Sequence, residues 1–296
     1  MAYILNDSTI FKLEHLNPSD VYRLSVGNKI FGRGLPFIWA IKNRAINLYH
    51  ALNIAAAEGI LDIFMYLHNT GHRFDAQIMT TVVQYGHLDC LQYLHEIGVE
   101  WDKSTCLNAA WLGHLDCLIY LHENGCPWDS LSCLFAAENG HLNCLEYLHE
   151  EGCPWHLKTC KAAAKCGHLN CLIYAHMNGS EWDSETCSAA AGNGHLDCLK
   201  YLHDNGCEWA QNTTYWAAFS GYLDCLLYAH EEGCDWDWRS YWAAARNSHL
   251  DCVQYLYEQG CPWNRLVCRE VKDPTILTYL KSKGLCLHDR RSRSDW

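Results

Sequence analysis

The sequence predicts an all-α protein, a solenoid of helix-turn-helix repeats, and two observations carry this prediction. The first is a repeat of 27 residues, marked by a glycine at the same place in seven successive units and by Ser248 in the next slot. The second is that each unit holds two stretches with apolar residues at helical spacing. A period this strict indicates one supersecondary unit stacked on itself, because a unit of this length cannot bury its apolar face alone. The marking glycines are Gly59, Gly86, Gly113, Gly140, Gly167, Gly194 and Gly221.

The unit that begins at Gly113, with the sequence GHLDCLIYLHENGCPWD, shows the expected elements in order. Leucines at helical spacing from Leu115 to Leu121 predict one helix, and Gly125 predicts its end. Asp129 follows the linker CPWD and is placed to cap the next helix, SLSCLFAAEN. Two adjacent alanines in that helix would let neighbouring helices approach closely. Each unit is therefore expected to form two short antiparallel helices.

These segments resemble a known family. GHLDCLIYLHENG is similar to the second helix of an ankyrin repeat, G-H-L-E-V-V-K-L-L-L-E-A-G, and STCLNAAWL to the first helix, T-P-L-H-L-A-A. The resemblance covers about residues 46–284. Ankyrin repeats have about 33 residues, and the residues missing here fall between the Trp of CPWD and the next helix. The resemblance therefore implies an ankyrin-type solenoid with shortened or absent β-hairpin fingers, similar to the Cys- and Trp-rich ankyrin proteins of giant DNA viruses.

Composition excludes several classes of function. The 296 residues carry 22 basic and 34 acidic side chains, a net charge of −12, which argues against binding to nucleic acid or anionic lipid. No apolar run reaches the roughly 18–20 residues of a membrane helix, and the N-terminus lacks the pattern of a signal peptide. We therefore expect a cytoplasmic protein (in the host cytoplasm if it is viral), a monomer, with reduced thiols.

Seventeen of the 19 cysteines fall into three columns of the repeat, in slots where ankyrin repeats carry Val or Leu or in the linker. Buried cysteine behaves as a small hydrophobe, so we expect packing residues. Equivalent residues of stacked helices lie about 8–10 Å apart, too far to converge on a metal ion or to form disulfides between repeats. No metal and no cofactor is expected. The columns are Cys90, Cys117, Cys144, Cys171, Cys198, Cys225 and Cys252; Cys106, Cys133, Cys160, Cys187 and Cys268; and Cys126, Cys153, Cys207, Cys234 and Cys261.

Histidine and tryptophan also recur at the period. Histidines at the start of one helix, such as His87, are expected to bond backbone groups of the turn, and histidines late in it, such as His122, are expected to be partly exposed. The linker tryptophans from Trp101 to Trp263 are interpreted as an aromatic ridge that fills the space of the missing hairpins. A ligand-binding ridge is the alternative.

Positions that vary between repeats are candidates for partner binding. By resemblance, two of the varying slots face the concave groove of an ankyrin solenoid. Trp, Tyr and Arg, which are enriched at interface hot spots, cluster in two consecutive repeats. The alternative is that Tyr215, Trp216, Tyr241 and Trp242 are local core substitutions. The predicted groove residues are Trp111, Tyr215, Phe219, Trp238, Arg239, Trp242 and Arg246.

The first 40 residues do not follow the period. LNPSDVYRLSVGNKIF resembles the middle of an F-box, L-D-P-x-D-L-x-R-L-S-x-V-x-K-x-W, with Leu16, Pro18, Val21 and Leu24 as contact residues, although Asn6 stands where a proline is expected. The alternative is a helical cap for the first repeat. The expected domains are an F-box-like or capping helical module at 1–40, the ankyrin-type repeats at 41–284 and a disordered polar tail at 285–296.

Together these features predict a protein–protein interaction adaptor and not an enzyme, because no nucleophile–base set or phosphate loop occurs. The repeat groove would hold a protein partner. The F-box resemblance implies that residues 1–40 would hold the bridging subunit of a cullin-based ubiquitin ligase. The alternative is a plain ankyrin scaffold that binds or sequesters a partner without a ubiquitin link.

Overall fold

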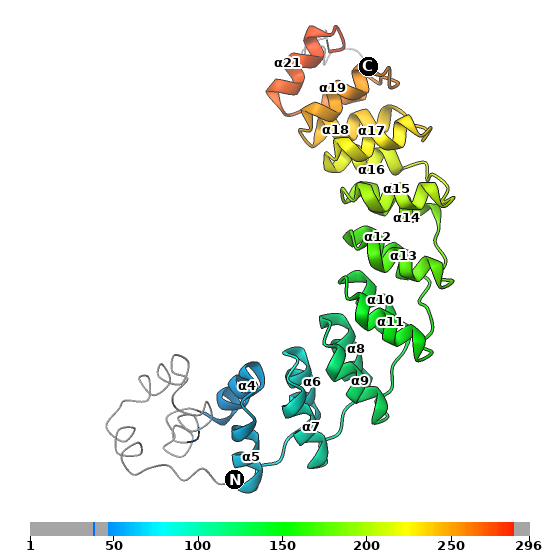
Figure 1. The fold of residues 1–296 in the computed structure, drawn as a ribbon. Helices are drawn as coiled ribbons and strands as arrows, with labels where there is room; N and C mark the ends of the chain where they lie inside the picture. Colours follow the sequence, from blue (N-terminus) through cyan, green and yellow to red (C-terminus); the bar gives the residue numbers. More distant parts are fainter. Residues whose placement is uncertain (1–37, 39–46, 287–296) are drawn as a thin grey trace, which may run out of the picture. The chain divides into compact units, whose positions relative to one another are not determined.

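The computed structural model describes residue 38 and residues 47–286, and within those residues it contains helices and no strand (Figure 1). This confirms the predicted all-α, ankyrin-type helix-turn-helix fold without β-hairpin fingers. The helices alternate between a first and a second member of each repeat. They are α4 Leu48–Glu58, α5 Leu61–Asn69, α6 Ala76–Gln84, α7 Leu88–Glu96, α8 Lys103–Leu112, α9 Leu115–Glu123, α10 Ser130–Glu138, α11 Leu142–Glu150, α12 Thr159–Cys166, α13 Leu169–Met177, α14 Ser184–Gly192, α15 Leu196–Asp204, α16 Thr213–Ser220, α17 Leu223–Glu231, α18 Trp238–Arg246, α19 Leu250–Glu258, α20 Leu266–Glu270 and α21 Pro274–Ser282.

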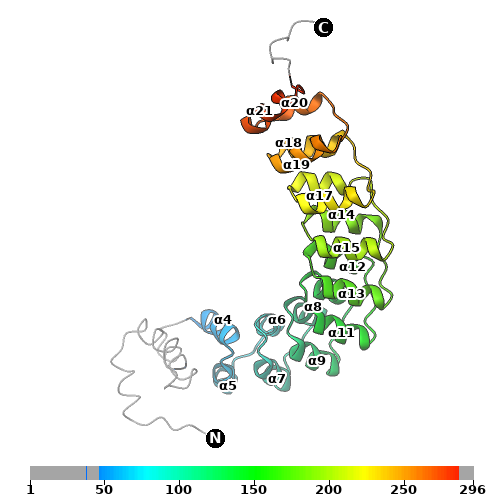
Figure 2. The same ribbon diagram turned by 45° about the horizontal axis from the view of Figure 1, so that its top comes forward.

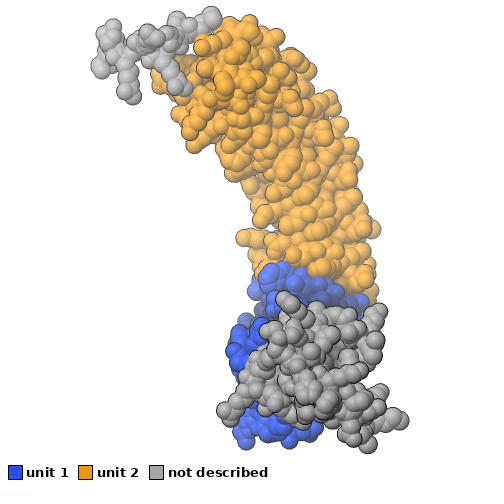
Figure 3. All heavy atoms as spheres, turned by 90° about the vertical axis from the view of Figure 1, so that its left-hand side faces the viewer, with its two compact units in different colours: residues 1–132 blue, residues 133–296 orange. Residues whose placement is uncertain are grey.

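The chain forms two compact units, residues 1–132 and residues 133–296 (Figure 3). The F-box-like residues Leu16, Pro18, Val21 and Leu24 lie outside the described residues, as do residues 287–296 of the expected tail. Cys286, at the start of that tail, is described and buried. The domain boundaries at 40 and 284 stay predictions.

Helix ends follow the local chemistry that the sequence indicates. The Asp129 side chain accepts a hydrogen bond from the Leu131 backbone N–H at 2.9 Å, as expected for the cap of α10. Gly125, just after α9, has a φ of 84°, and its N–H donates to the His122 carbonyl at 2.9 Å. A residue without Cβ ends the helix here because the left-handed conformation is costly for other residues.

The core of each repeat is narrow and built from small side chains. In the second unit, each first helix from α12 to α18 packs against its own second helix and against the first helix of the next repeat (Figure 2). Ala163 and Ala164 of α12 are fully buried at this contact, which lets the helices approach closely. The second helix contributes a cysteine and two larger residues, for example Cys144, Leu145 and Leu148 of α11. Repeats are thus held together mainly by apolar burial between neighbours.

Histidines at the start of the second helices link neighbouring repeats. The Nε2 atoms of His87, His114 and His249 lie 3.0, 3.1 and 3.0 Å from backbone carbonyls of the preceding repeat. This confirms the expected bond to a turn and shows that the turn belongs to the neighbour. Each ring also lies over the repeat-marking glycine of that neighbour, so a Cβ there would overlap ring atoms. At Ser248, which has a φ of 67°, the corresponding residue of the next repeat is Ile276, not an aromatic ring.

The second histidine column pairs with the tryptophans. His176 and Trp182 stack with ring centroids 3.7 Å apart, and the Tyr201 hydroxyl of the next repeat lies 2.9 Å from His176 Nδ1. Trp182 also meets Tyr201 edge-on at 6.2 Å. The same stacking occurs between His122 and Trp128, His149 and Trp155, His203 and Trp209, and His230 and Trp236. The ridge is therefore a mixed His–Trp–Tyr network, and its tryptophans are half-buried.

The cysteines are mainly packing residues, with one exception. Among 17 free thiols all are buried except Cys166, which is half-buried. Burial raises the pKa of Cys90 and Cys117 to about 12, with a further contribution from the aspartate beside each. Cys268 and Cys286 form a disulfide with Cα atoms 5.8 Å apart, so the expectation that every thiol is free was wrong. The spacing argument applies to equivalent residues of successive repeats, whereas this pair closes the last helix pair on itself.

Candidate functional site

Two consecutive first helices of the second unit, α16 and α18, carry a cluster of aromatic side chains. Tyr215 and Trp216 meet edge-on with centroids 5.1 Å apart, and Phe219 stacks against Tyr215 at 6.0 Å one turn later. On α18, Trp238 and Trp242 lie one turn apart and are half-buried. The spacing of three or four residues places these rings on the same side of their helices.

The cluster encloses a pocket of about 340 Å³. Four of its six lining residues are predicted groove residues, and Asn212 and Trp216 complete it. We name this site the aromatic pocket. It is lined by Asn212, Tyr215, Trp216, Trp238, Arg239 and Trp242.

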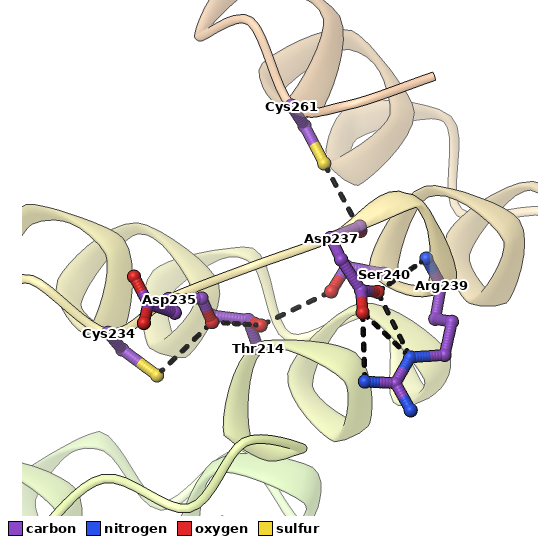
Figure 4. Close-up of polar contacts among 7 residues, drawn as sticks. All are labelled: Thr214, Cys234, Asp235, Asp237, Arg239, Ser240 and Cys261. Atoms are coloured by element: carbon purple, nitrogen blue, oxygen red, sulfur yellow. Dashed lines mark hydrogen bonds and ion pairs between the residues drawn. The ribbon is translucent and has the colours of Figure 1, made fainter. Parts of the chain in front are cut away.

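Two arginines lie at the aromatic pocket, one paired with a carboxylate and the other beside an aromatic ring. Arg239 is bound by Asp237, with Nη2 to Oδ2 and Nε to Oδ2 both at 2.8 Å, and Asp237 also caps α18 (Figure 4). Arg246 is exposed, and its guanidinium carbon lies 4.9 Å from the centre of the Trp242 ring. Arg239 is thus partly neutralised, while Arg246 presents its charge beside an aromatic face.

A layer of buried hydroxyls and thiols supports α16 and α18. The Thr214 hydroxyl donates to the Asp235 carbonyl at 3.2 Å and lies 3.2 Å from the Ser240 hydroxyl (Figure 4). Cys261 donates to the Asp237 carbonyl at 3.4 Å. Burial raises the pKa of Cys261 to about 12, so this thiol stays neutral and acts as packing.

The structure separates the two interpretations of the varying aromatic residues. Tyr241 is 1% exposed and packs edge-on against Trp263 at 4.8 Å, so it is a core substitution in a slot that holds cysteine in five other repeats and Thr214 in the preceding one. Trp216 is 39% exposed and lines the aromatic pocket. The sequence offered a signal for Trp216, because the same slot holds alanine at residues 189 and 243.

The remaining predicted groove residue is in the other unit. Trp111 lies on α8 of the first unit and is 45% exposed, and it is not among the residues that line the aromatic pocket. Of the other six, Tyr215, Trp238, Arg239 and Trp242 line the pocket, while Phe219 and Arg246 border it.

Two further classes of site were sought in the described parts of the chain. In residues 38 and 47–286, no three His, Cys, Asp or Glu side chains converge in a way that could hold a metal ion. None of the helices over the same ranges combines the length and apolarity of a membrane-spanning segment.

Comparisons with known proteins bear on the family. The model for ankyrin repeats (3 copies) matches residues 187–267, which include the aromatic pocket. No curated protein sequence matches this chain. Among solved structures, the human ASB11 ankyrin repeat domain is similar at 20% identity with a TM-score of 0.48, over 53% of this chain and 84% of that one. The chain therefore has an ankyrin-type helical repeat fold, and its residues 187–267 carry the sequence pattern of ankyrin repeats.

Proposed function

We propose that this protein is a protein–protein interaction adaptor that captures a partner in the aromatic pocket and does no chemistry itself. The observation that carries the proposal is the convergence of Trp216, Trp238, Trp242 and Tyr215 on one pocket of the repeats, with Arg239 in its lining and Arg246 against the Trp242 ring. Trp, Tyr and Arg are enriched among the residues that dominate the binding energy of protein interfaces, and Trp and Tyr bury large areas with only two rotatable side-chain bonds.

The size of the pocket also supports a protein partner. A volume of about 340 Å³ lies near the lower end of the range for small-molecule sites and suits one or two inserted side chains. The neighbouring repeats would supply further contact area along the partner. Ankyrin repeats are suited to this role, because a stack of repeats presents an extended row of variable side chains.

Affinity purification followed by mass spectrometry tests the proposal. The double variant Trp238→Ala/Trp242→Ala should lose the partner that the unchanged protein retains. Met177→Ala is the matched control, because Met177 is an exposed apolar residue (75%) at the end of a second helix. Equal recovery of every protein by the double variant and the control, with far-UV circular dichroism unchanged, would exclude the pocket as the capture site.

We further propose that residues 1–40 connect the captured protein to a cullin-based ubiquitin ligase, on the strength of the F-box resemblance alone. Deletion of these residues should abolish co-purification of the ligase bridging subunit and leave partner capture intact. The alternative is a plain scaffold that sequesters its partner, and it predicts no bridging subunit with either form. The many free thiols suit a reducing compartment, so we propose the cytoplasm, or the host cytoplasm if the resemblance to viral ankyrin proteins is correct.

A further inference from the structure

The two sets of helices in the second unit carry opposite charge. The second helices α11, α13, α15, α17, α19 and α21 hold eight carboxylates and two cations, Lys200 and Lys281. The first helices α10, α12, α14, α16, α18 and α20 hold five cations and three carboxylates, Glu138, Glu185 and Glu270. In a protein with a net charge of −12, the row of first helices to which the aromatic pocket belongs thus carries a small excess of positive charge.

The cations lie in the same repeat columns as the pocket residues. One column runs from Lys161 through Tyr215 and Trp242 to Arg269, and another from Lys165 through Phe219 to Arg246, all at multiples of the 27-residue period. Successive first helices from α12 to α20 pack against one another. Equivalent positions therefore face the same way, and the pocket has cations on both sides along the stack.

These cations are available to a partner. In the part of the chain that the structure describes, no carboxylate is within ion-pair distance of Lys161, Lys165, Arg246 or Arg269. Lys165, Arg246 and Arg269 are exposed.

The carboxylates on this side of the unit are few, and two of them are engaged. Asp237 binds Arg239, and Asp273 accepts hydrogen bonds from the backbone N–H groups of Thr275 and Ile276 at the start of α21. Glu185 and Glu270 are exposed and remain as local negative charges. They reduce the positive charge of the surface without cancelling it.

We propose that the partner segment is an acidic polypeptide, with carboxylates on both sides of a large apolar side chain that enters the aromatic pocket. This inference rests on the proposed function and specifies the chemistry of the partner. Beyond about 8 Å, charges are largely screened at physiological ionic strength, so the cations along these columns act on a bound segment more strongly than the distant carboxylates of the second helices.

The repeat geometry gives the spacing of the acidic residues. Neighbouring repeats are about 8–10 Å apart and an extended chain rises about 3.3 Å per residue, so one repeat corresponds to about three residues of peptide. Lys161 and Lys165 precede α16 by two repeats, and Arg269 follows α18 by one. We expect carboxylates about six residues from the anchor on one side and about three on the other.

Aromatic rings with arginines also occur where single-stranded nucleic acid binds. The charge here favours a peptide, because nucleic-acid grooves follow a continuous phosphate backbone with many cations. The two repeats that form the pocket offer only Arg246 unpaired, since Arg239 is held by Asp237. An acidic peptide needs only a few separated cations.

Selection from a display library of random peptides of about 12 residues, the length that spans these columns, tests the inference. The full chain is the target and Trp238→Ala/Trp242→Ala is the counter-target. Peptides selected on the full chain alone should carry more Asp and Glu than Lys and Arg. Arg246→Gln and Arg269→Gln should each weaken the best peptide by about 1.5- to 5-fold and reduce its dependence on salt. Lys200→Gln, on the acidic second helices, is the matched control and should leave the affinity unchanged.

The other outcomes are distinguishable. Selected peptides that are neutral or basic but still require Trp238 and Trp242 would overturn the acidic partner and leave the proposed function standing. Failure to select any peptide that distinguishes the full chain from the counter-target would overturn both. A short oligouridine RNA that binds the full chain, loses binding in the two arginine variants and displaces the selected peptides would overturn the inference in favour of nucleic acid.

Discussion

Replacement of Gly221 by alanine tests the contact that joins one repeat to the next. A Cβ on Gly221 would overlap the His249 ring, whose Cε1 would be 2.6 Å away. His249 Nε2 lies 3.0 Å from the Phe219 carbonyl, so a displaced ring also loses a hydrogen bond between repeats. Gly233 is the matched control, because both glycines have a φ of 82° but nothing lies within 4 Å of a Cβ on Gly233.

The two substitutions should differ in cost. In Gly233→Ala the only cost is that alanine must adopt the left-handed conformation, which is about 1 kcal/mol for a residue with a side chain. In Gly221→Ala the alanine adopts the same left-handed conformation, and the packed His249 ring must also move, which typically adds about 1–3 kcal/mol. We therefore expect Gly221→Ala to lower the free energy of unfolding by about 2–4 kcal/mol.

Urea unfolding followed by far-UV circular dichroism measures both variants. The double variant Gly221→Ala/His249→Ala should lose only about 1 kcal/mol more than His249→Ala alone, because the overlap has gone and only the cost of the left-handed conformation remains. A double-mutant cycle gives the coupling. Equal losses for Gly221→Ala and Gly233→Ala would refute the reasoning, since they would show that the ring does not pack on the glycine.

Three further predictions concern the ring network and the thiols. Trp155 is half-buried, stacks on His149 and donates from Nε1 to the Asn178 carbonyl at 2.9 Å. Trp155→Ala should therefore lower the free energy of unfolding in urea by about 1.5–3 kcal/mol, less than the loss for a fully buried Trp. A loss below about 0.5 kcal/mol would contradict this role. Burial lowers the pKa of His176 from its ordinary value of 6.5, so the unfolded chain binds more protons than the folded chain does. The stability that is present at pH 7 should therefore fall as the pH drops through 6.5 towards the folded value. The slope of Tm against pH between 7 and 5 should be smaller in His176→Gln than in the unchanged protein, and an equal slope would contradict this. Cys166 is the one free thiol that is not buried, so a disulfide reagent should react with one thiol of the folded protein first and with the others only on unfolding. Partial burial raises the pKa of Cys166, so this first phase should be slower than the reaction of a fully exposed thiol. Persistence of the first phase in Cys166→Ser would show that another thiol is accessible.

Several features of the candidate site could be read from the sequence. The 27-residue period places Tyr215 and Trp242 in one column and Phe219 and Arg246 in another. It could not show that Arg239 would be held by Asp237 two residues away, or that Tyr241 would be buried while Trp242 lines a pocket. These outcomes depend on side-chain rotamers and on the surface of the next repeat, which a linear pattern does not contain.

The sequence by itself determined the repeat, the helix boundaries and the burial of the cysteines, because each depends on spacing within about one unit. The glycine stops, the aspartate caps and the apolar positions are local signals repeated many times. Only the tertiary structure decided which rings meet. Trp182, for example, stacks on His176 of its own repeat and meets Tyr201 of the next, because the neighbour's second helix supplies the facing surface.

The same distinction explains the one error about the thiols. In a regular repeat, the first-helix cysteine and the linker residue that it faces are 20 positions apart, as in Cys106 and Cys126, which are not joined by a disulfide. In the last helix pair Cys268 and Cys286 are 18 apart and bonded. The sequence shows the shorter spacing, but the approach of the two sulfur atoms is decided by how α20 and α21 fold back on each other, and that is a property of the tertiary structure alone.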